Sequence, residues 1–237
     1  MKVILIKFRY ISLAISLILI ISIIFSIQKN NILATIWFSQ MEEPIRNGDN
    51  LLEKMAFTCN VDWGNENIPK LLDILDHSNI KITFFISGRW AQNNPELLKM
   101  IFDRGHEIGN HGYSHKMHSK IGRQDNYEEI KRTEDSIYEV LHIKTNLFAP
   151  PSGDFSKTTI AVANEMGYKT ILWSIDTIDW KDGSTSAVII ERVMKKSHKG
   201  AILLMHPKEA TVEALPTIID RISSKGIRIG TVSYLLE

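Results

Sequence analysis

The sequence contains a single cysteine, Cys59, so no disulfide bond can form within the chain. It also lacks an excess of either charge, because 28 Lys and Arg against 27 Asp and Glu give a formal net charge of +1. A nearly neutral chain has no strong field to attract nucleic acid or another polyanion, and no nucleic-acid-binding motif is present. The apolar surroundings of Cys59 favour an inert core thiol over a reactive one.

Charged residues are absent from one long run near the N-terminus. Tyr10–Ile27 is dominated by Ile, Leu and Ser and follows three basic residues. As a helix this run spans about 27 Å, close to the roughly 30 Å hydrocarbon core of a bilayer, and its basic flank is expected to stay in the cytoplasm. Residues 1–30 are therefore predicted to be a membrane anchor with the rest of the chain outside the cytoplasm. The alternative is a signal peptide cleaved near Leu33–Ala34, which gives a secreted form.

Strand and helix patterns alternate from residue 53 to the C-terminus, after a polar stretch, residues 31–52, that is predicted to be a linker. This alternation indicates parallel β-α units, and the order fits a barrel-like α/β domain over residues 53–237. The predicted strands are residues 54–61, 80–87, 106–110, 146–150, 168–175, 200–206 and 227–232. The predicted helices are residues 68–77, 95–105, 126–141, 156–167, 187–196 and 215–224.

Polar and aromatic side chains follow five of these predicted strands. Functional sites of such folds lie on the loops at the carboxyl ends of the strands, so these residues are candidates for one common site. They are Asn60, Asp62 and Trp63 after the first strand, His111 and His115 after the third, Pro151 and Ser152 after the fourth, Asp176, Asp179 and Trp180 after the fifth, and His206 after the sixth.

His111 and His115 form an H-x-x-x-H pair, a spacing that can bring two imidazoles to one metal ion. Histidines also fall four apart by chance, so the pair alone does not establish a metal site. Asp62 adds a carboxylate from a neighbouring strand end. Two imidazoles and one carboxylate leave coordination positions open for water and substrate, which is typical of a catalytic metal site.

His206 ends an apolar run and, taken alone, is better explained as a buried core residue than as a functional one. The strand end that carries Asp176 and Asp179 favours a second interpretation. A carboxylate can orient an imidazole and favour its protonated form, so that it donates a proton near neutral pH. No role is predicted for four other histidines, which are expected to be solvated: His77, His118, His142 and His198.

Five short motifs resemble those of the polysaccharide deacetylases (NodB homology, carbohydrate esterase family 4). They are TCNVDWG, HGYSH, APPSG, DTIDW and LMH, in that order over residues 53–237. The W-G after the first motif and the W-S-x-D-T-x-D-W near the fourth are most similar to sporulation-associated members. The resemblance implies a distorted, TIM-like (β/α)7 barrel of the NodB type that removes N-acetyl groups from amino sugars of a peptidoglycan-type cell-wall glycan.

The resemblance also implies a cofactor. A divalent metal, usually zinc, with cobalt or another metal as alternatives, would bind Asp62, His111 and His115. It would polarise the amide carbonyl and activate water.

The resemblance implies roles for further residues. The backbone N–H of Ser152 would stabilise the oxyanion, and His206 would protonate the leaving amine under the influence of Asp179. Trp180, with Pro151 beside it, would line the acetyl pocket.

Two positions depart from the family pattern. Asn60 stands where the family has an aspartate as general base, and an amide accepts no proton at neutral pH. Ala149 stands where the family has the arginine that pairs with this base. Metal-bound hydroxide could carry a slower reaction, Glu66 could replace the base, or hydrolysis could be lost and only glycan binding or a structural role in the envelope retained. Hydrolysis of another C–N bond is a further alternative.

Overall fold

The computed structural model describes residues 43–237 and residues 19, 20, 22, 23, 25, 26 and 28 of the N-terminal segment. The chain divides into two compact units, Met1–Met41 and Glu42–Glu237. The predicted membrane anchor, residues 1–30, lies for the most part outside the described residues, and those of its residues that are described are helical. Within the described part of the chain, no helix combines the length and the apolar character needed to cross a membrane.

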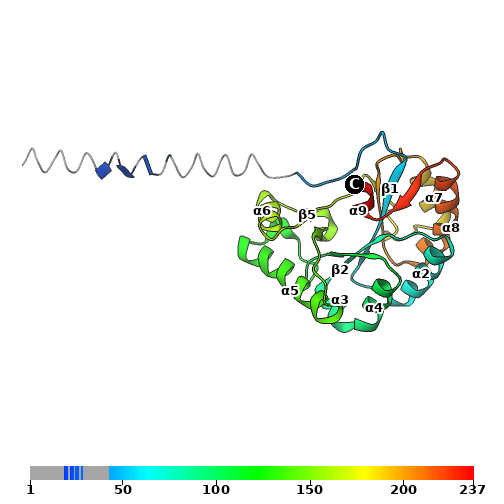
Figure 1. Ribbon diagram of the computed structural model, residues 1–237, viewed down its shortest axis with the longest axis horizontal. Coiled ribbons are helices and arrows are strands. Elements are labelled where there is room, and N and C mark those ends of the chain that lie inside the picture. The colour runs from blue at the N-terminus through cyan, green and yellow to red at the C-terminus, as the bar shows by residue number, and fades with distance from the viewer. Residues whose placement is uncertain (1–18, 21, 24, 27, 29–42) are drawn as a thin grey trace, which may run out of the picture. The chain divides into compact units, whose positions relative to one another are not determined.

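Parallel strands form one sheet in the larger unit, in the order β5-β4-β3-β2-β1-β7-β6, with β8 paired to β1 (Figure 1). The pairing path of the described strands has β5 and β6 at its two ends, so the sheet is an open half-barrel. This confirms the predicted parallel α/β fold of barrel type. The strands are β1 (Lys54–Val61), β2 (Thr83–Ile86), β3 (Glu107–Asn110), β4 (Leu147–Phe148), β5 (Lys169–Thr170), β6 (Ile175–Asp176), β7 (Ile202–Met205) and β8 (Arg228–Gly230).

The opening in the sheet falls inside one predicted strand, residues 168–175, which is interrupted between β5 and β6. At the interruption the chain pairs with Ile45: the amide of Ile45 donates to the carbonyl of Thr170 at 2.8 Å, and the amide of Leu172 donates to Ile45 at 2.8 Å. Ile45 belongs to the predicted linker, residues 31–52, so the end of that segment is part of the larger unit. Residues 170–172 pair with Ile45 at the point where β5 and β6 would otherwise be one continuous strand.

Helices lie around the outside of the sheet (Figure 1). Their starts follow local signals: Pro69 lies in the first turn of α2, Pro95 in that of α4, and the hydroxyl of Ser156 caps α6 in a reciprocal capping box with Thr159. The helices are α2 (Ile68–His77), α3 (Gly88–Asn93), α4 (Pro95–Asp103), α5 (Arg123–Leu141), α6 (Lys157–Glu165), α7 (Ser186–Met194), α8 (Glu209–Ser223) and α9 (Val232–Leu236), with short 3-10 turns η1 (Asn65–Asn67), η2 (His118–Lys120) and η3 (Pro151–Gly153).

Strand β1 shows how the sheet separates core from site. Its odd-numbered side chains, from Met55 to Val61, belong to the large apolar core that the sheet shares with α2, α4, α7 and α8. Its even-numbered side chains face the other way, because successive side chains of a strand alternate. Ala56 packs inside the half-barrel, and Asn60 lies further along that same face. Cys59 is buried in the core as predicted, and burial raises the pKa of its thiol.

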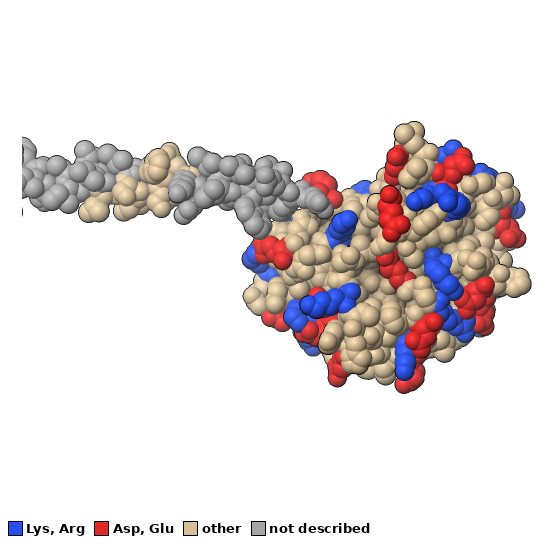
Figure 2. Space-filling view, in the orientation of Figure 1, with Lys and Arg blue, Asp and Glu red and all other residues tan. Residues whose placement is uncertain are grey.

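The surface carries charges of both signs. Figure 2 shows acidic and basic side chains interspersed over the face of the larger unit that it draws. Many of them are paired, for example Lys70 with Glu209 and Lys199 with Glu53. Exposed pairs of this kind contribute little to stability, so the apolar core is the main source of the free energy of folding.

Candidate active site

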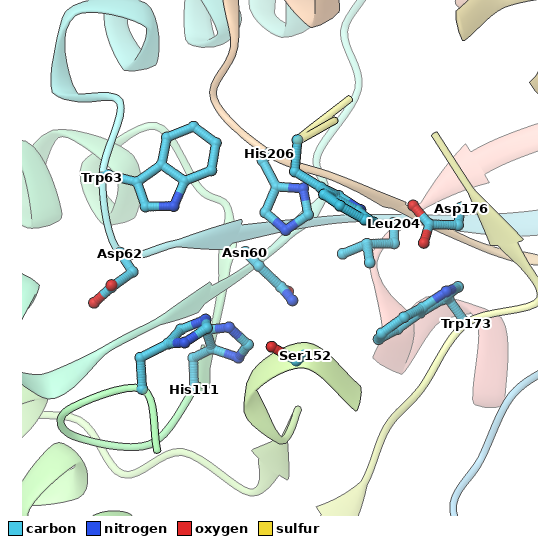
Figure 3. A pocket seen from close by; sticks show the side chains of 11 residues that line it. Asn60, Asp62, Trp63, His111, Ser152, Trp173, Asp176, Leu204 and His206 are labelled. Carbon is cyan, nitrogen blue, oxygen red and sulfur yellow. The ribbon is translucent and has the colours of Figure 1, made fainter. Parts of the chain in front are cut away.

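A pocket of about 460 Å³ opens at the carboxyl ends of the strands (Figure 3). Most of the predicted site residues meet there, from strand ends and the segments that follow them, while Asp179 lies behind His206 and Pro151 is buried in η3 without lining the pocket. Glu66 is exposed and lines a different, shallower hollow. The pocket is lined by Asn60, Asp62, Trp63, His111, His115, Ser152, Trp173, Asp176, Trp180, Leu204 and His206.

Asn60 lies near the carboxyl end of β1. The even-numbered face of β1 directs its side chain into the pocket, between His206 and Ser152 (Figure 3). The residue is 5% exposed, and its Oδ1 atom accepts no hydrogen bond from the described residues. Ala149 is also buried. Neither of these two side chains carries a charge.

Hydrogen bonds beside the two histidines fix the backbone of the loop that follows β3. The Asn110 side chain accepts a hydrogen bond from the amide of Gly112 at 2.9 Å. Ser114 donates to the buried carboxylate of Glu129 through both its amide, at 2.8 Å, and its hydroxyl, at 2.6 Å. These contacts allow His115 to adopt a left-handed backbone conformation with φ of 58°. A turn, and not a regular helix, brings the two rings together.

The rings of His111 and His115 lie 5.3 Å apart at an angle of 74°. His111 is buried, and its Nδ1 atom donates to the carbonyl of Ala149 at 2.7 Å. That hydrogen bond leaves the lone pair on Nε2. Burial and the neighbouring His115 lower the pKa of His111 to about 3, so the ring is neutral at physiological pH. A neutral imidazole with a free Nε2 is a suitable metal donor.

Asp62 is held by Ser87, which directly precedes α3, and by Arg89 in the first turn of α3. Its Oδ1 atom accepts from the Ser87 hydroxyl at 2.5 Å and from Nε of Arg89 at 2.8 Å, and its Oδ2 atom pairs with Nη2 of the same guanidinium. Burial would raise the pKa of the Asp62 carboxyl, but the hydrogen bonds from Arg89 and Ser87 outweigh it and hold that pKa below its usual range. The carboxylate is therefore ionised, and both of its oxygens are bound by Arg89.

The three predicted metal ligands do not form a preassembled site. Within the described part of the chain, no three His, Cys, Asp or Glu side chains are grouped closely enough to hold a metal ion. The two imidazoles have the chemistry of metal donors, but the Asp62 carboxylate points away from the centre of the pocket in Figure 3 and is bound to Arg89. In this arrangement the residues do not fit a three-ligand metal.

His206 forms the opposite wall of the pocket, and Asp179 lies behind it. Nδ1 of His206 donates to Oδ1 of Asp179 at 2.7 Å, while the His206 amide and the Thr211 hydroxyl donate to Oδ2 at 2.7 and 2.6 Å. Burial would raise the pKa of Asp179, but these hydrogen bonds prevail and lower it. The pair fixes the imidazole so that its Nε2 atom faces the pocket, the geometry of a general acid or base.

Aromatic side chains complete the walls. The ring of Trp63 is stacked on that of His206 with centroids 5.7 Å apart, and Trp173 and Trp180 line the far side. Trp180 is 53% exposed, so part of its ring is open to a ligand. Flat aromatic faces suit the apolar face of a sugar or an acetyl group.

Some residues of the site carry no sequence prediction. The end of β2 has no predicted site residue, yet it supplies Ser87 and Arg89 to the carboxylate of Asp62. The polar run Ser87–Arg89 directly after an apolar strand is the signal that could have revealed them. Trp173 could not be found in this way, because it stands within a predicted strand and reaches the pocket only where that strand is interrupted.

The fold and the pocket define a parallel half-barrel protein with a carboxylate-bound histidine and a facing pair of imidazoles at the carboxyl ends of its strands. The family described as polysaccharide deacetylase matches residues 48–171, more than half of the chain. The chain therefore belongs to the polysaccharide deacetylase family, which confirms the resemblance of its motifs. Enzymes of this family are generally metal-dependent.

Relatives with known names share most of this chain. An uncharacterized Bacillus subtilis (strain 168) protein, YlxY, is 42% identical over 84% of this chain and 62% of its own length. A Bacillus cereus peptidoglycan-N-acetylglucosamine deacetylase is 32% identical over 73% of this chain and 64% of its own length. The chain thus matches somewhat less than two thirds of the length of these relatives.

A solved structure is also similar. BA3943 from Bacillus Anthracis, a pseudoenzyme of carbohydrate esterase family 4, superposes with a TM-score of 0.80 at 38% identity, over 82% of this chain and 69% of its own. A mutant of that pseudoenzyme with restored enzymatic activity superposes with the same TM-score. The same fold therefore occurs in this family with and without activity.

Proposed function

We propose that this protein binds an N-acetylated amino sugar of a peptidoglycan-type glycan and hydrolyses its acetamide group as a deacetylase of reduced rate. The observation that carries the proposal is the pair of facing imidazole groups in one pocket. His206, with Asp179 behind it, stands on one wall, and His111 and His115 stand on the other. The substrates named for its deacetylase relatives are peptidoglycan sugars, and the motif resemblance favours cell-wall or spore-wall glycan.

The residues have separate tasks in this proposal. Water adds to the carbonyl carbon of the acetamide group and gives up one proton to the solvent. As the C–N bond breaks, His206, protonated on both ring nitrogens, gives the proton on Nε2 to the nitrogen of the leaving amine, so that acetate and the free amine are formed. Asp179 keeps the ring oriented while it carries charge. The aromatic wall at Trp180 holds the acetyl methyl group and the sugar face. The backbone N–H of Ser152 is proposed to stabilise the oxyanion. Asn60 takes up no proton, so the reaction lacks a factor of about 10²–10⁴ that a general base supplies.

The proposed cofactor is a divalent metal, with zinc preferred and cobalt as an alternative. His111 and His115 would hold it, and Asp62 would join them after release from Arg89. The neutral state of His111 and its free Nε2 atom support this assignment.

Replacing His111 by alanine tests the proposal. We expect the full-length chain, purified in detergent, to release acetate slowly from N-acetylglucosamine oligomers or peptidoglycan with added zinc or cobalt, and His111→Ala to abolish that release. His77→Ala removes an exposed histidine at the end of α2 and is expected to leave the rate unchanged. A wild-type protein that is folded and supplied with metal, yet releases no acetate above background, would contradict hydrolysis.

A second function is favoured by the same pocket: binding of glycan without turnover, as a structural component of the envelope. Three observations favour it, namely the amide of Asn60, the uncharged Ala149 and the engagement of Asp62 by Arg89. The similarity to a pseudoenzyme of the family supports it as well. Retained binding of chitooligosaccharide, measured by calorimetry on a protein without acetate release, would distinguish this function from hydrolysis.

We also propose that the protein is anchored in the cell membrane by residues 1–30, with the larger unit outside the cytoplasm. The uncharged run Tyr10–Ile27 and its basic flank support the proposal. We expect the full-length chain to sediment with membranes and to resist extraction by carbonate, and a chain that begins after residue 30 to lose this property. If cells that express the full-length chain release a protein without residues 1–34 into the culture medium, a cleaved signal peptide is established instead.

A further inference from the structure

We infer that Arg89 competes with metal for the carboxylate of Asp62, so that this protein holds a divalent ion weakly until the guanidinium moves away. The inference rests on the proposed function for the identity of the metal site. It concerns one residue to which the sequence motifs assign no role. It also accounts for the absence of a preassembled three-ligand site among the described residues.

The contact between the two side chains has the geometry of a specific pair. Arg89 reaches both oxygens of Asp62 through Nε and Nη2, the two-pronged arrangement in which a guanidinium matches a carboxylate. The Asp62 side chain is only 8% exposed, while that of Arg89 is 49% exposed. The guanidinium therefore covers the carboxylate from the solvent side and takes one acceptor position on each of its two oxygens.

The backbone that carries Arg89 is fixed on both sides. The amide of Ser87 donates to the carbonyl of Val61 at 3.0 Å, which joins this loop to the end of β1. The amide of Arg89 donates to the carbonyl of Tyr113 at 3.1 Å, which joins it to the loop that carries the histidines. The start of α3 is thus joined to both segments that supply the predicted ligands, and it presents Arg89 to Asp62.

Charge makes the competition effective. A carboxylate already paired with a guanidinium gives a divalent ion little additional attraction, and the guanidinium repels a second cation held nearby. With Asp62 withheld, only His111 and His115 remain as donors. Removal of the positive charge frees one anionic ligand and removes one repulsion, so metal affinity should rise by about tenfold or more.

Zinc affinity of Arg89→Ala, compared with that of the wild-type full-length chain, tests the inference. Competition with a chromophoric chelator reports the dissociation constant without any need for turnover. We expect Arg89→Ala and Arg89→Gln to bind zinc about tenfold more tightly or better, and the double variant Arg89→Ala/Asp62→Asn to lose that gain. Arg104→Ala is the matched control, because Arg104 also pairs with carboxylates, at Asp73 and Asp76, but lies away from the pocket.

The outcomes separate this inference from the proposed hydrolysis. Tighter zinc binding by both Arg89 variants supports the inference even where no acetate is released, and that combination contradicts only the deacetylase activity. Zinc affinity that is unchanged or weaker in folded Arg89→Ala and Arg89→Gln overturns the inference, whatever the rate of acetate release. A gain that survives the additional Asp62→Asn substitution overturns it too, because the freed carboxylate would then have no part in it.

Discussion

Replacing Asn60 by aspartate should raise the rate of acetate release by about 10²-fold or more, the usual contribution of a general base. Asparagine and aspartate have the same shape, so the substitution adds a proton acceptor without changing the packing. The side chain already points into the pocket, and its Oδ1 atom accepts no hydrogen bond from the described residues. A carboxylate oxygen at this position would face the same space as His111 and His206.

The new carboxylate would also be poorly solvated. Asn60 is 5% exposed, and Ala149 supplies no positive charge beside it, so burial should raise the pKa of the introduced carboxyl. A base acts only when deprotonated, and the gain in rate should therefore appear as the pH rises through that raised pKa. The double variant Asn60→Asp/Ala149→Arg should move the rise to lower pH, because the arginine stabilises the ionised form.

Rate profiles between pH 5 and 9 for the wild type and both variants measure these effects. Asn67→Asp is the matched control, since Asn67 is buried with an Oδ1 atom that the described residues leave without a partner, and it lies outside the pocket. A chain with Asn60→Asp that is folded but no faster than wild type at any pH would show that the missing base does not limit the reaction. Faster release by Asn67→Asp would show that the effect is not local.

Much of the fold could be predicted from periodicity, because strands and helices of this type bury one side and follow each other in order. The helix at Ile68–His77 and the strand at Lys54–Val61 occur at the predicted positions. The helix is marked by an apolar pattern with a proline in its first turn, and the strand by a largely apolar run. Predictions failed where contacts between residues distant in sequence determine the local structure. The interruption between β5 and β6 depends on pairing with Ile45, more than 120 residues away in sequence, and local pattern carries no signal for it.

The start of α8 and the buried histidines show two further limits. Helix α8 begins at Glu209, not at Leu215, and includes Pro216 in its interior, whereas a proline pattern favours a helix start at that point. His118 and His198 were expected to be solvated and are buried. Nδ1 of His118 lies 2.7 Å from Oδ1 of Asn126, at the start of α5. Polar neighbours in sequence did not indicate these tertiary hydrogen bonds.

The sequence predicts which residues meet in the pocket better than it predicts how their side chains are oriented. Motif spacing placed Asp62, His111 and His115 at the correct strand ends, because each motif is local and each strand end is marked by a change from apolar to polar residues. It could not tell which way a carboxylate would turn. The orientation of Asp62 depends on Arg89, a residue from another strand end whose charge has no role in the motifs.

Replacing Asp179 by asparagine should lower the free energy of unfolding by about 3 kcal/mol at pH 7. Asp179 is 3% exposed and accepts three hydrogen bonds of 2.6–2.7 Å, from the amide and ring of His206 and from the hydroxyl of Thr211. An amide carries no charge, and its NH₂ group would face donors on at least one side, so one buried hydrogen-bonding group is left unsatisfied. The imidazole of His206 also loses the partner that orients it, so the rate of acetate release should fall together with the stability of the protein.

The pH dependence of stability distinguishes this charge from ordinary packing. The pKa of Asp179 is lowered in the folded state, so its contribution is fully present above the unfolded value of about 4 and is lost as the pH falls through the folded value. Urea unfolding should therefore show the largest difference between wild type and Asp179→Asn near neutral pH and a smaller one below about pH 4. Asp182→Asn, at an exposed carboxylate on the same loop, should change stability by less than about 0.5 kcal/mol. If the difference in the free energy of unfolding between wild type and Asp179→Asn stays constant down to pH 3, the negative charge of Asp179 is not the source of its contribution. Its shape and packing would then account for the loss of stability.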